Sequence, residues 1–578
     1  MDGTALLTRP TPTAPAPRRF RALPWLLVVG WGVQLLVRLW ITRYSTGPVA
    51  NPDETGYLLA ARLFAGGVGG DMSSHTFYRG GYPLFLVPVF WFTDDSVTAY
   101  RAISAIGSAV SAAAFPLAYA LLRRLGLALR PALVLGFAAG LSPAVVVFAG
   151  LALVDAVLPT LVLAWLLALY DLVDRGTAAP AVACGLLSGL ALSIHLRGTI
   201  VFVTFVLAVT ALLILRRLPR PAALWALGSA ALAAGLGLAL NAHLAATLYS
   251  GGTRDLSGQA MQRMTSLDGQ ARALAGAAGQ IWYLGVGTWG LAALGLVAAL
   301  ALLVRTLLAR TLLIRARGSA VPGRLALLVV AAALLIVTLG IAYTSAAALP
   351  DEHRVGNYVY GRYLAAVAVP WTVAGIAVLA RAARRAVLAA TGAAAALTVA
   401  MGALAAWHAG DRLTRYTFIA FDFPEVIFLT RLNDRLDLGR TMAIALLLLA
   451  GLAAAAIAAR TLTRRQWGTA LLAAALAVPN LAFVAHLAPK AAPSGPGWLP
   501  EPPRHGPVAI AREVHWGVHT PMQWFVSWSP LQRFEGDTPP ADACSAIVKP
   551  DAAAPPQGWT LVRRSRHWQL WTRSGCQT

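Results

Sequence analysis

Two adjacent carboxylates, Asp53 and Glu54, begin a segment with the residue types expected of a catalytic base. They lead into Tyr57 and an apolar run that ends at Phe64. The spacing of this run predicts a short helix lying at a membrane surface. A carboxylate held there beside a partly dry cavity has a raised pKa and can remove a proton from a hydroxyl group. The alternative is a solvated helix N-terminus, with Asp53 as its cap and Glu54 complementing the helix dipole.

A third carboxylate, Asp155, lies near the end of an apolar stretch. An ionisable group in such a place is costly and usually faces a cavity or a charged partner. The alternative is a boundary residue whose side chain reaches toward water. His195 and Arg197 lie farther along, in a short turn between two apolar runs. We therefore treat Asp155, His195 and Arg197 as candidate site residues.

Further arginines stand next to tyrosines in two polar segments. Arg79 and Tyr82 belong to the first segment, and Arg354, Arg362 and Tyr363 to the second. The planar guanidinium group donates two hydrogen bonds to neighbouring oxygens, so these arginines suit a phosphate. The alternative is an interfacial anchor, because Arg and Tyr are both favoured at the level of the lipid headgroups.

Most of the chain is too apolar for a soluble protein. Of its 578 residues, 58% are hydrophobic and 12% are charged, whereas a soluble chain carries roughly 25% charged residues. The formal net charge of +23 would suggest nucleic-acid binding in a soluble protein. Here the basic residues stand in short clusters between apolar runs, which is typical of membrane orientation, so no nucleic-acid partner is expected.

Apolar stretches of about 20 residues are needed to cross the ~30 Å hydrocarbon core of a bilayer. On this criterion we expect an all-α polytopic membrane protein with about thirteen transmembrane helices. The expected spans cover 23–42, 100–122, 131–147, 152–172, 179–195, 198–215, 222–247, 281–304, 324–346, 362–380, 386–407, 441–459 and 467–487. The first span is too long for a cleaved signal peptide and lacks the small residues of a cleavage site.

Arginine clusters fill every second connection between these spans, beginning with Arg18, Arg19 and Arg21 before the first span. This alternation predicts a cytoplasmic N-terminus and, with an odd number of spans, a C-terminus outside the cytoplasm. The expected plasma-membrane protein has a cytoplasmic N-terminal tail at 1–22 and a transmembrane domain at 23–487. Its first outer loop is 43–99, and an extracytoplasmic C-terminal module covers 488–578.

Strand-like runs in the tail predict that this module is a small α/β or β-rich unit. The runs are 508–510, 523–528, 546–548, 559–562 and 568–572. Cys544 and Cys576 both lie in the tail, and an oxidising compartment favours a disulfide between them. Two free thiols are the alternative.

In their order along the chain, these motifs resemble the GT-C class of membrane glycosyltransferases. The resemblance is greatest to the transferases of this class that use dolichyl- or polyprenyl-phosphate sugars. Asp53 and Glu54, before a short helix with Tyr57, match the acidic pair of that family's first outer loop. Asp155 matches a second acidic residue near the outer end of a later span, and Arg362-Tyr363 matches an Arg-Tyr element in a late outer loop.

The resemblance covers about the first 200 residues and the region 347–370, and hardly extends to the tail. The chain departs from the family where it reads Gly81-Tyr82-Pro83, because two prolines or Lys-Pro are usual there. The resemblance therefore leaves the role of Arg79 open.

The resemblance implies an inverting glycosyltransferase, with a polyprenyl-phosphate hexose or pentose as donor and membrane lipid around it. The acceptor would be a glycan, a glycolipid or a protein. Asp53 would be the base, and Glu54 and Asp155 would orient the acceptor or hold an ion. The expected donor-phosphate contacts are Arg197, Arg362, Arg79 and Arg354, and the expected acceptor or sugar contacts are Tyr57, Tyr82, His195 and Tyr363. No cofactor or metal is required; a divalent cation at Asp53 or Glu54 is the alternative.

Two other classes of function stay open. A transporter or flippase of a lipid-linked substrate would show repeats and charge near the bilayer midplane, whereas here the charges stand at the outer ends of spans. A non-catalytic cell-envelope scaffold would bind polymer through its outer module. A nucleotide donor is not expected, because the sequence contains no Gly-x-x-x-x-Gly-Lys segment.

Overall fold

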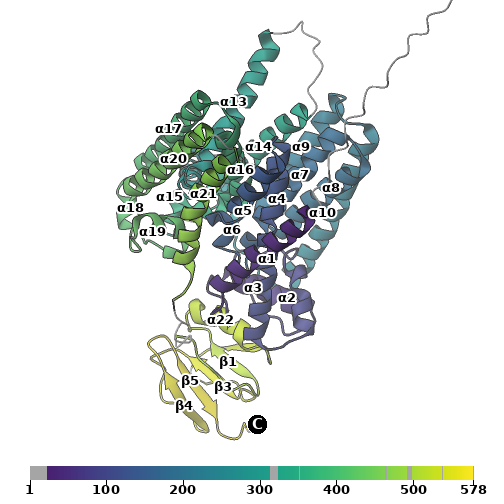
Figure 1. Cartoon of the computed structure of the whole chain (residues 1–578). Coiled ribbons are helices and arrows are strands. Elements are labelled where there is room, and N and C mark those ends of the chain that lie inside the picture. The colour runs from purple at the N-terminus through teal and green to yellow at the C-terminus, as the bar shows by residue number, and fades with distance from the viewer. Residues whose placement is uncertain are drawn as a thin grey trace, which may run out of the picture.

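The computed structural model describes residues 22–312, 323–349, 352–462, 465–490, 498–536 and 538–576. Long apolar helices form a bundle, and a small sheet-containing module lies at one end of it (Figure 1). The predicted fold class, an all-α polytopic membrane protein with a small C-terminal module, is confirmed.

Within the described residues, ten helical segments are long and apolar enough to cross a membrane. They comprise α1 (Leu23–Ile41), α3 (Ser96–Ala112) with α4 (Ala114–Arg124), α9 (Leu196–Ile214), α10 (Arg220–Leu248), α13 (Leu291–Leu312), α14 (Arg324–Ala348), α15 (Gly356–Val359) with η4 (Gly361–Leu364) and α16 (Ala365–Arg381), α17 (Arg384–Ala409), α20 (Leu438–Thr461) and α21 (Arg465–Leu487). The other three predicted spans fall on α5 (Leu129–Ala139), α7 (Leu158–Arg175) and α8 (Ala178–Ile194), which are shorter or carry more charge.

Several predicted spans are not continuous helices; besides 100–122, divided between α3 and α4, and 362–380, which begins with η4 before α16, three further spans are interrupted. The span at 131–147 is divided into α5 and α6 (Pro143–Val146), and the span at 152–172 begins with η3 (Val154–Ala156) before α7. The span at 281–304 is divided between α12 (Leu267–Val286) and α13, where Trp289 and Gly290 have positive φ. Non-helical backbone at membrane depth is tolerated where it lies inside protein or lines a cavity. These breaks therefore point toward the interior site described below.

The first outer loop folds as a helix covered by other parts of the chain. The predicted helix is present as α2 (Asp53–Phe64), but it does not lie on the surface, since Glu54 through Arg62 are buried. It is followed by η1 (Pro83–Phe85) and η2 (Val87–Trp91), whose exposed large apolar side chains include Phe85 and Trp91. The apolar face of α2, which the sequence predicts to lie at the membrane surface, is packed against protein instead.

The C-terminal module is a five-stranded mixed sheet with strand order β2-β1-β3-β5-β4. The strands are β1 (Val508–Ala511), β2 (Leu531–Phe534), β3 (Ser545–Val548), β4 (Trp559–Arg564) and β5 (Gln569–Arg573). The strand predicted at 523–528 is wrong, because its first residues end the helix α22 (Trp516–Phe525), and β2 lies farther along. The predicted disulfide between Cys544 and Cys576 is confirmed.

The module is fixed to the first outer loop through α22. Arg62 at the end of α2 donates hydrogen bonds from Nη2 to the carbonyl of Gln523 at 2.7 Å and from Nη1 to that of Trp524 at 3.2 Å. The side-chain amide of Gln523 in turn bonds both the N–H and the carbonyl of Asp71, at 2.6 and 2.9 Å. The first outer loop and the module therefore lie on the same side of the membrane.

Candidate active site

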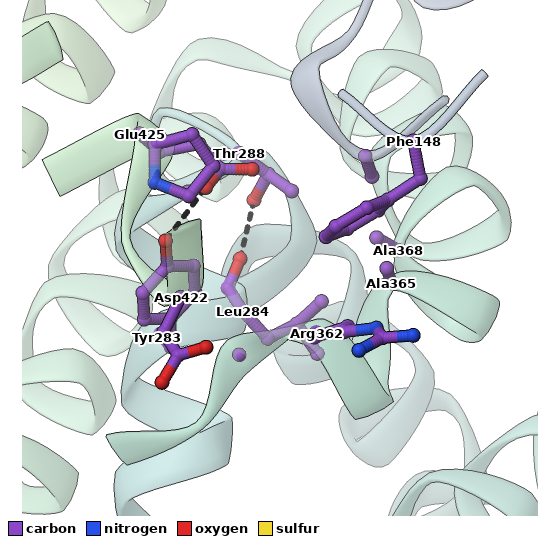
Figure 2. A pocket seen from close by; sticks show the side chains of 13 residues that line it. Phe148, Tyr283, Leu284, Thr288, Arg362, Ala365, Ala368, Asp422 and Glu425 are labelled. Carbon is purple, nitrogen blue, oxygen red and sulfur yellow. Dashed lines mark hydrogen bonds between the residues drawn. The ribbon is translucent and has the colours of Figure 1, made fainter. Parts of the chain in front are cut away.

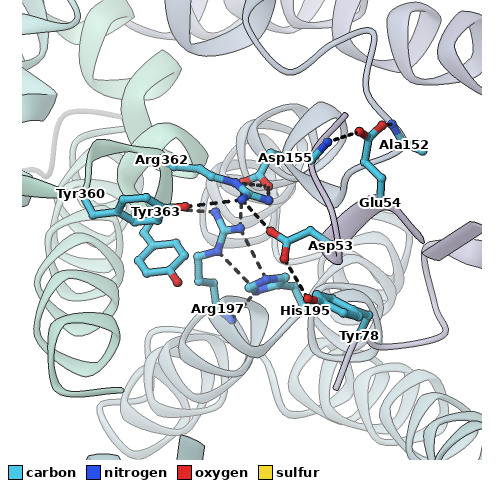
Figure 3. Close-up of polar contacts among 11 residues, drawn as sticks. Asp53, Glu54, Tyr78, Ala152, Asp155, His195, Arg197, Tyr360, Arg362 and Tyr363 are labelled. Carbon is cyan, nitrogen blue, oxygen red and sulfur yellow. Dashed lines mark hydrogen bonds and ion pairs between the residues drawn. The ribbon is translucent and has the colours of Figure 1, made fainter. Parts of the chain in front are cut away.

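Four charged side chains from four separate elements meet in one cluster (Figure 3). Arg362 bridges two carboxylates, with its Nη1 2.7 Å from Asp53 Oδ2 and its Nη2 2.8 Å from Asp155 Oδ2. Arg197 completes the cluster with its Nη2 2.7 Å from Asp155 Oδ1. We call Asp53, Asp155, Arg197 and Arg362 the charge cluster. The sequence motifs that carry these residues are thus brought together in space.

Asp155 is the buried centre of the charge cluster. Its side chain is fully buried, and both of its oxygens face guanidinium groups. Two positive groups at hydrogen-bond distance favour the ionised form of this buried carboxyl. Asp155 therefore stays ionised and holds the two arginines in fixed positions.

Asp53 is the member of the charge cluster that remains accessible. About a third of its side chain (32%) is exposed, whereas the side chain of Asp155 is fully buried. Its Oδ1 accepts a hydrogen bond from the hydroxyl of Tyr78 at 2.7 Å. The alternative of Asp53 as a helix cap is wrong, because the cap position is Pro52 and no side chain caps α2. Asp53 still lies in the first turn, where the helix dipole favours its charge.

Glu54 faces away from the charge cluster (Figure 3). Its fully buried carboxylate accepts hydrogen bonds from the backbone N–H groups of Val49, Ala50 and Ala152, each at 2.8 Å, and from the hydroxyl of Tyr100 at 2.6 Å. Burial raises the pKa of Glu54 despite these bonds. Glu54 thus joins the start of α2 to the segment that carries Asp155.

His195 and Tyr363 flank Arg197. The His195 Nδ1 accepts from the Arg197 backbone N–H at 3.0 Å, so this nitrogen carries no proton. The ring is therefore neutral and acts here as an acceptor. The Tyr363 ring centre lies 5.2 Å from the Arg197 Cζ, a cation–π contact. Both residues orient Arg197 toward Asp155.

Tyr57 and Tyr82 are packed inside the protein near the charge cluster and do not face an open pocket. Both are buried, and the Tyr57 ring centre is 5.3 Å from those of Tyr78 and Tyr82. Tyr78, which sequence reasoning did not select, is the tyrosine that bonds Asp53. Its close approach to α2 depends on Gly56, where a Cβ atom would lie 2.2 Å from the Tyr78 ring.

Arg79 and Arg354 do not contact the carboxylates of the charge cluster. Arg79 donates to the backbone carbonyls of Leu192 and His195, at the end of α8. Arg354 pairs with Glu352, with 3.3 Å between Nε and Oε2, and its Cζ lies 5.5 Å from the centre of the Tyr360 ring. The structure therefore separates the four arginines into two inside the charge cluster and two beside it.

A small cavity borders Arg362 (Figure 2). Its free space of about 20 Å³ admits little more than a water-sized group. Apolar side chains such as Phe148 and Leu284 form one wall, and Asp422 and Glu425 form another. Sequence reasoning selected neither acid, because both stand among aromatic and apolar residues with no other charged group beside them.

Burial raises the pKa of both cavity acids. The pKa of Asp422 is raised to about 6 and that of Glu425 to about 7, with the hydroxyl of Tyr283 bonding Glu425 at 2.6 Å. The buried Oδ2 of Asp422 has no hydrogen-bond partner within the described residues. No group of three or more His, Cys, Asp or Glu side chains able to hold a metal occurs in the described part of the chain.

Comparison with known proteins identifies the fold. No protein-family model and no curated protein sequence matches the chain. Among solved structures, ArnT from Cupriavidus metallidurans bound to undecaprenyl phosphate is 13% identical, with a TM-score of 0.50 over 96% of this chain and 99% of that one. The same protein in the apo state is 15% identical, with a TM-score of 0.47 over 95% and 98%. The Archaeoglobus fulgidus oligosaccharyltransferase is 14% identical, with a TM-score of 0.36 over 89% and 65%.

The chain has the fold of the GT-C membrane glycosyltransferases over almost its whole length. The resemblance inferred from short motifs in the first 200 residues and in 347–370 is therefore confirmed at the level of fold, and it extends through the C-terminal module.

The contacts of Glu54 predict that its substitution destabilises the protein. Glu54→Gln places an amide N–H₂ group among four hydrogen-bond donors, so at least one buried donor is left unpaired, at a cost of about 3 kcal/mol. Thermal unfolding of the purified protein should show a clearly lowered midpoint. Tyr100→Phe, which removes a single donor, should cost only about 1–2 kcal/mol. Equal midpoints for Glu54→Gln and the parent protein would contradict this role.

The raised pKa of Glu425 predicts a dependence of stability on pH. A carboxyl with a pKa of about 7 in the folded state and 4.5 when unperturbed favours folding fully below pH 4.5, and loses this advantage as pH rises through 7. The advantage is about 3 kcal/mol. The difference in unfolding midpoint between Glu425→Gln and the parent should therefore shift in favour of the variant from pH 5 to pH 8. Glu501→Gln, at an exposed position, should show no such shift, and a constant difference for Glu425→Gln would refute the prediction.

Proposed function

We propose that this chain is an inverting glycosyltransferase, which moves a sugar from a polyprenyl-phosphate donor to an acceptor outside the cytoplasm. The observation that carries the proposal is Asp53, a partly exposed carboxylate held against a buried arginine pair in a GT-C fold. The crystal structure of ArnT that has this fold contains undecaprenyl phosphate. That similarity supports a lipid phosphate as the donor.

The donor phosphate binds at Arg362 and Arg197. Asp53 and Asp155 together balance the charges of these two groups, so an incoming phosphate gains a positive partner by replacing Asp53 at Arg362. Because Asp155 already fixes both guanidinium groups, they need little rearrangement to stabilise charge on the leaving phosphate. Arg79 and Arg354 act indirectly, by holding the neighbouring backbone and Tyr360.

Asp53 acts as the base. As the acceptor hydroxyl oxygen attacks the anomeric carbon, its proton moves to Asp53, and the bond from that carbon to the phosphate oxygen breaks. The electron pair leaves with the phosphate, and polyprenyl phosphate is released. A phosphate bound to Arg362 competes with Asp53 for the same guanidinium, and its negative charge makes the carboxylate a stronger base. Donor binding thereby prepares Asp53 for proton transfer.

A single displacement follows from the accessibility of the carboxylates. Retention of configuration would need a second carboxylate positioned to form a covalent intermediate. Asp155 is fully buried between guanidinium groups, and Glu54 is fully buried under four donors. We therefore assign Glu54 and Asp155 positioning roles, instead of acceptor or ion contacts, and the mechanism uses no divalent cation.

The reaction takes place on the outer face of the plasma membrane. The arginine clusters predict a cytoplasmic N-terminus, which places the first outer loop and the module outside. Nucleotide sugars are not available there, so a lipid-linked donor is the chemically reasonable source of an activated sugar.

Asp53→Asn should abolish sugar transfer. The amide keeps the shape of the side chain but cannot take the acceptor proton, so kcat should fall about 10²- to 10⁴-fold. Transfer from polyprenyl-phosphate mannose or arabinofuranose is the measurement, with Asp268→Asn, an exposed residue at the start of α12, as the matched control. Retained activity in a correctly folded Asp53→Asn protein removes Asp53 from the role of base.

Arg362→Lys should weaken donor binding. Lysine keeps the positive charge but loses the planar donor arrangement that reaches two carboxylates and a phosphate together. We expect the affinity for polyprenyl phosphate without a sugar to fall about 10-fold. Arg354→Lys, beside the charge cluster, should change it by less than about twofold. Native mass spectrometry or a filter-binding assay measures both, and equal effects would argue against Arg362 as the phosphate contact.

A further inference from the structure

A second and larger cavity lies between the first outer loop and the C-terminal module. Its free space is about 200 Å³, well above that of the cavity beside Arg362 and below the ~300–1,000 Å³ of sites that enclose a drug-sized ligand. Its walls come from both parts of the chain: Arg62, Ala65, Gly66, Gly67, Val68, Phe90, Asp94, Ser96, Ala99, Trp524 and Ser527. We call it the seam cavity. None of its lining residues belongs to the charge cluster.

The seam cavity is held in shape by specific bonds. Arg62 ties α2 to the carbonyls of Gln523 and Trp524, and also donates to the carbonyl of Val68 at 2.6 Å. On the opposite wall, Ser527 Oγ donates to the carbonyl of Asp94 at 3.2 Å. An ion pair of 3.1 Å between Arg504 Nη1 and Asp95 Oδ1 joins the module to the loop next to that wall. These bonds hold the module to the first outer loop on two sides of the seam cavity.

The lining has the chemistry that recognises a saccharide. Trp524 is buried, and its indole N–H has no hydrogen-bond partner within the described residues, which leaves a donor to be satisfied by a ligand. Phe90 packs edge-on to Trp524 at 6.1 Å, so aromatic surface meets polar groups in one place. Asp94 and Ser96 add acceptor oxygens. Sugar rings present apolar C–H faces together with hydroxyls that both donate and accept.

The seam cavity lies at the opposite end of α2 from Asp53. Asp53 is the first residue of α2 and Arg62 lies near its last turn. At 1.5 Å per residue, the backbones of these residues are about 14 Å apart along the helix. That length corresponds to a few linked sugar rings, and it is the distance that an acceptor chain would have to span between the cavity and Asp53.

We propose that the seam cavity binds the saccharide part of the acceptor, several sugar residues away from the one that is modified. This inference rests on the proposed glycosyltransferase function and adds the chemical class of its acceptor. The saccharide can belong to a polysaccharide end or to a glycolipid headgroup. Recognition lies with Trp524 and Asp94, on the two sides of the seam.

Equilibrium binding without any donor tests this proposal. The full chain in lipid nanodiscs is titrated with short mannose and arabinofuranose oligosaccharides, with octyl glycosides of the same sugars, with octanol, and with a Ser/Thr-rich peptide. The variants are Trp524→Phe, which keeps an aromatic ring but loses the N–H, and Asp94→Asn, at an exposed position where folding is not at risk. Asp551→Asn, exposed on the module and outside the cavity lining, is the matched control.

A saccharide Kd that rises about fivefold or more in both variants, but stays constant in Asp551→Asn, supports the proposal. Tight binding of octyl glycosides alone then indicates a glycolipid headgroup, and comparable binding of free oligosaccharides indicates a polysaccharide end. Three results overturn the proposal. Octanol binds as tightly as its glycosides, or the peptide binds and the saccharides do not, or saccharide binding is unchanged in both variants. Because no donor is present, these results are independent of the transfer assay on Asp53→Asn, so failure of either proposal is recognised separately.

Discussion

The interaction on which the site depends is the buried bridge from Arg362 to Asp155. Isolated buried charges are expensive, and they persist only when geometry and hydrogen bonding compensate for lost hydration. Here Asp155 forms ion pairs with two guanidinium groups, and one of these, Arg362, also pairs with Asp53. The bridge joins residues separated by 207 and 309 positions in sequence. It therefore fixes the start of α2 relative to α7 and α16, the elements that enclose the reaction centre.

The short helix α2 links this centre to the C-terminal module. Its first residue supplies the accessible carboxylate, its second anchors the backbone before Asp155, and Arg62 near its end holds α22. A displacement of the module would therefore be transmitted along α2 toward Asp53. This arrangement explains why a helix with an apolar face is buried under protein instead of lying on lipid. It also gives the seam cavity and the charge cluster a common rigid wall.

The irregular segments next to the membrane helices carry residues of the charge cluster. Asp155 lies in the irregular segment before α7, and Arg362 in the 3-10 turn before α16. His195 lies between α8 and α9 and caps α9, and Arg197 lies in the first turn of α9. Backbone that leaves a helix exposes polar groups, which are tolerable only where protein satisfies them. The site therefore gathers at helix ends, where charged side chains and free backbone groups can pair.

The sequence by itself determined the membrane class, most of the apolar helices and the charged residues that stand between them. These features are local, because hydropathy and charge placement act on each segment separately. Asp53, Asp155, Arg197 and Arg362 could thus be named from sequence. Only the tertiary structure decided that Glu54 turns away from Asp53, that Arg79 and Arg354 stay outside the charge cluster, and that Tyr78, Asp422 and Glu425 lie beside it. Those outcomes depend on which donors and acceptors meet across hundreds of residues, and no local pattern encodes such pairings.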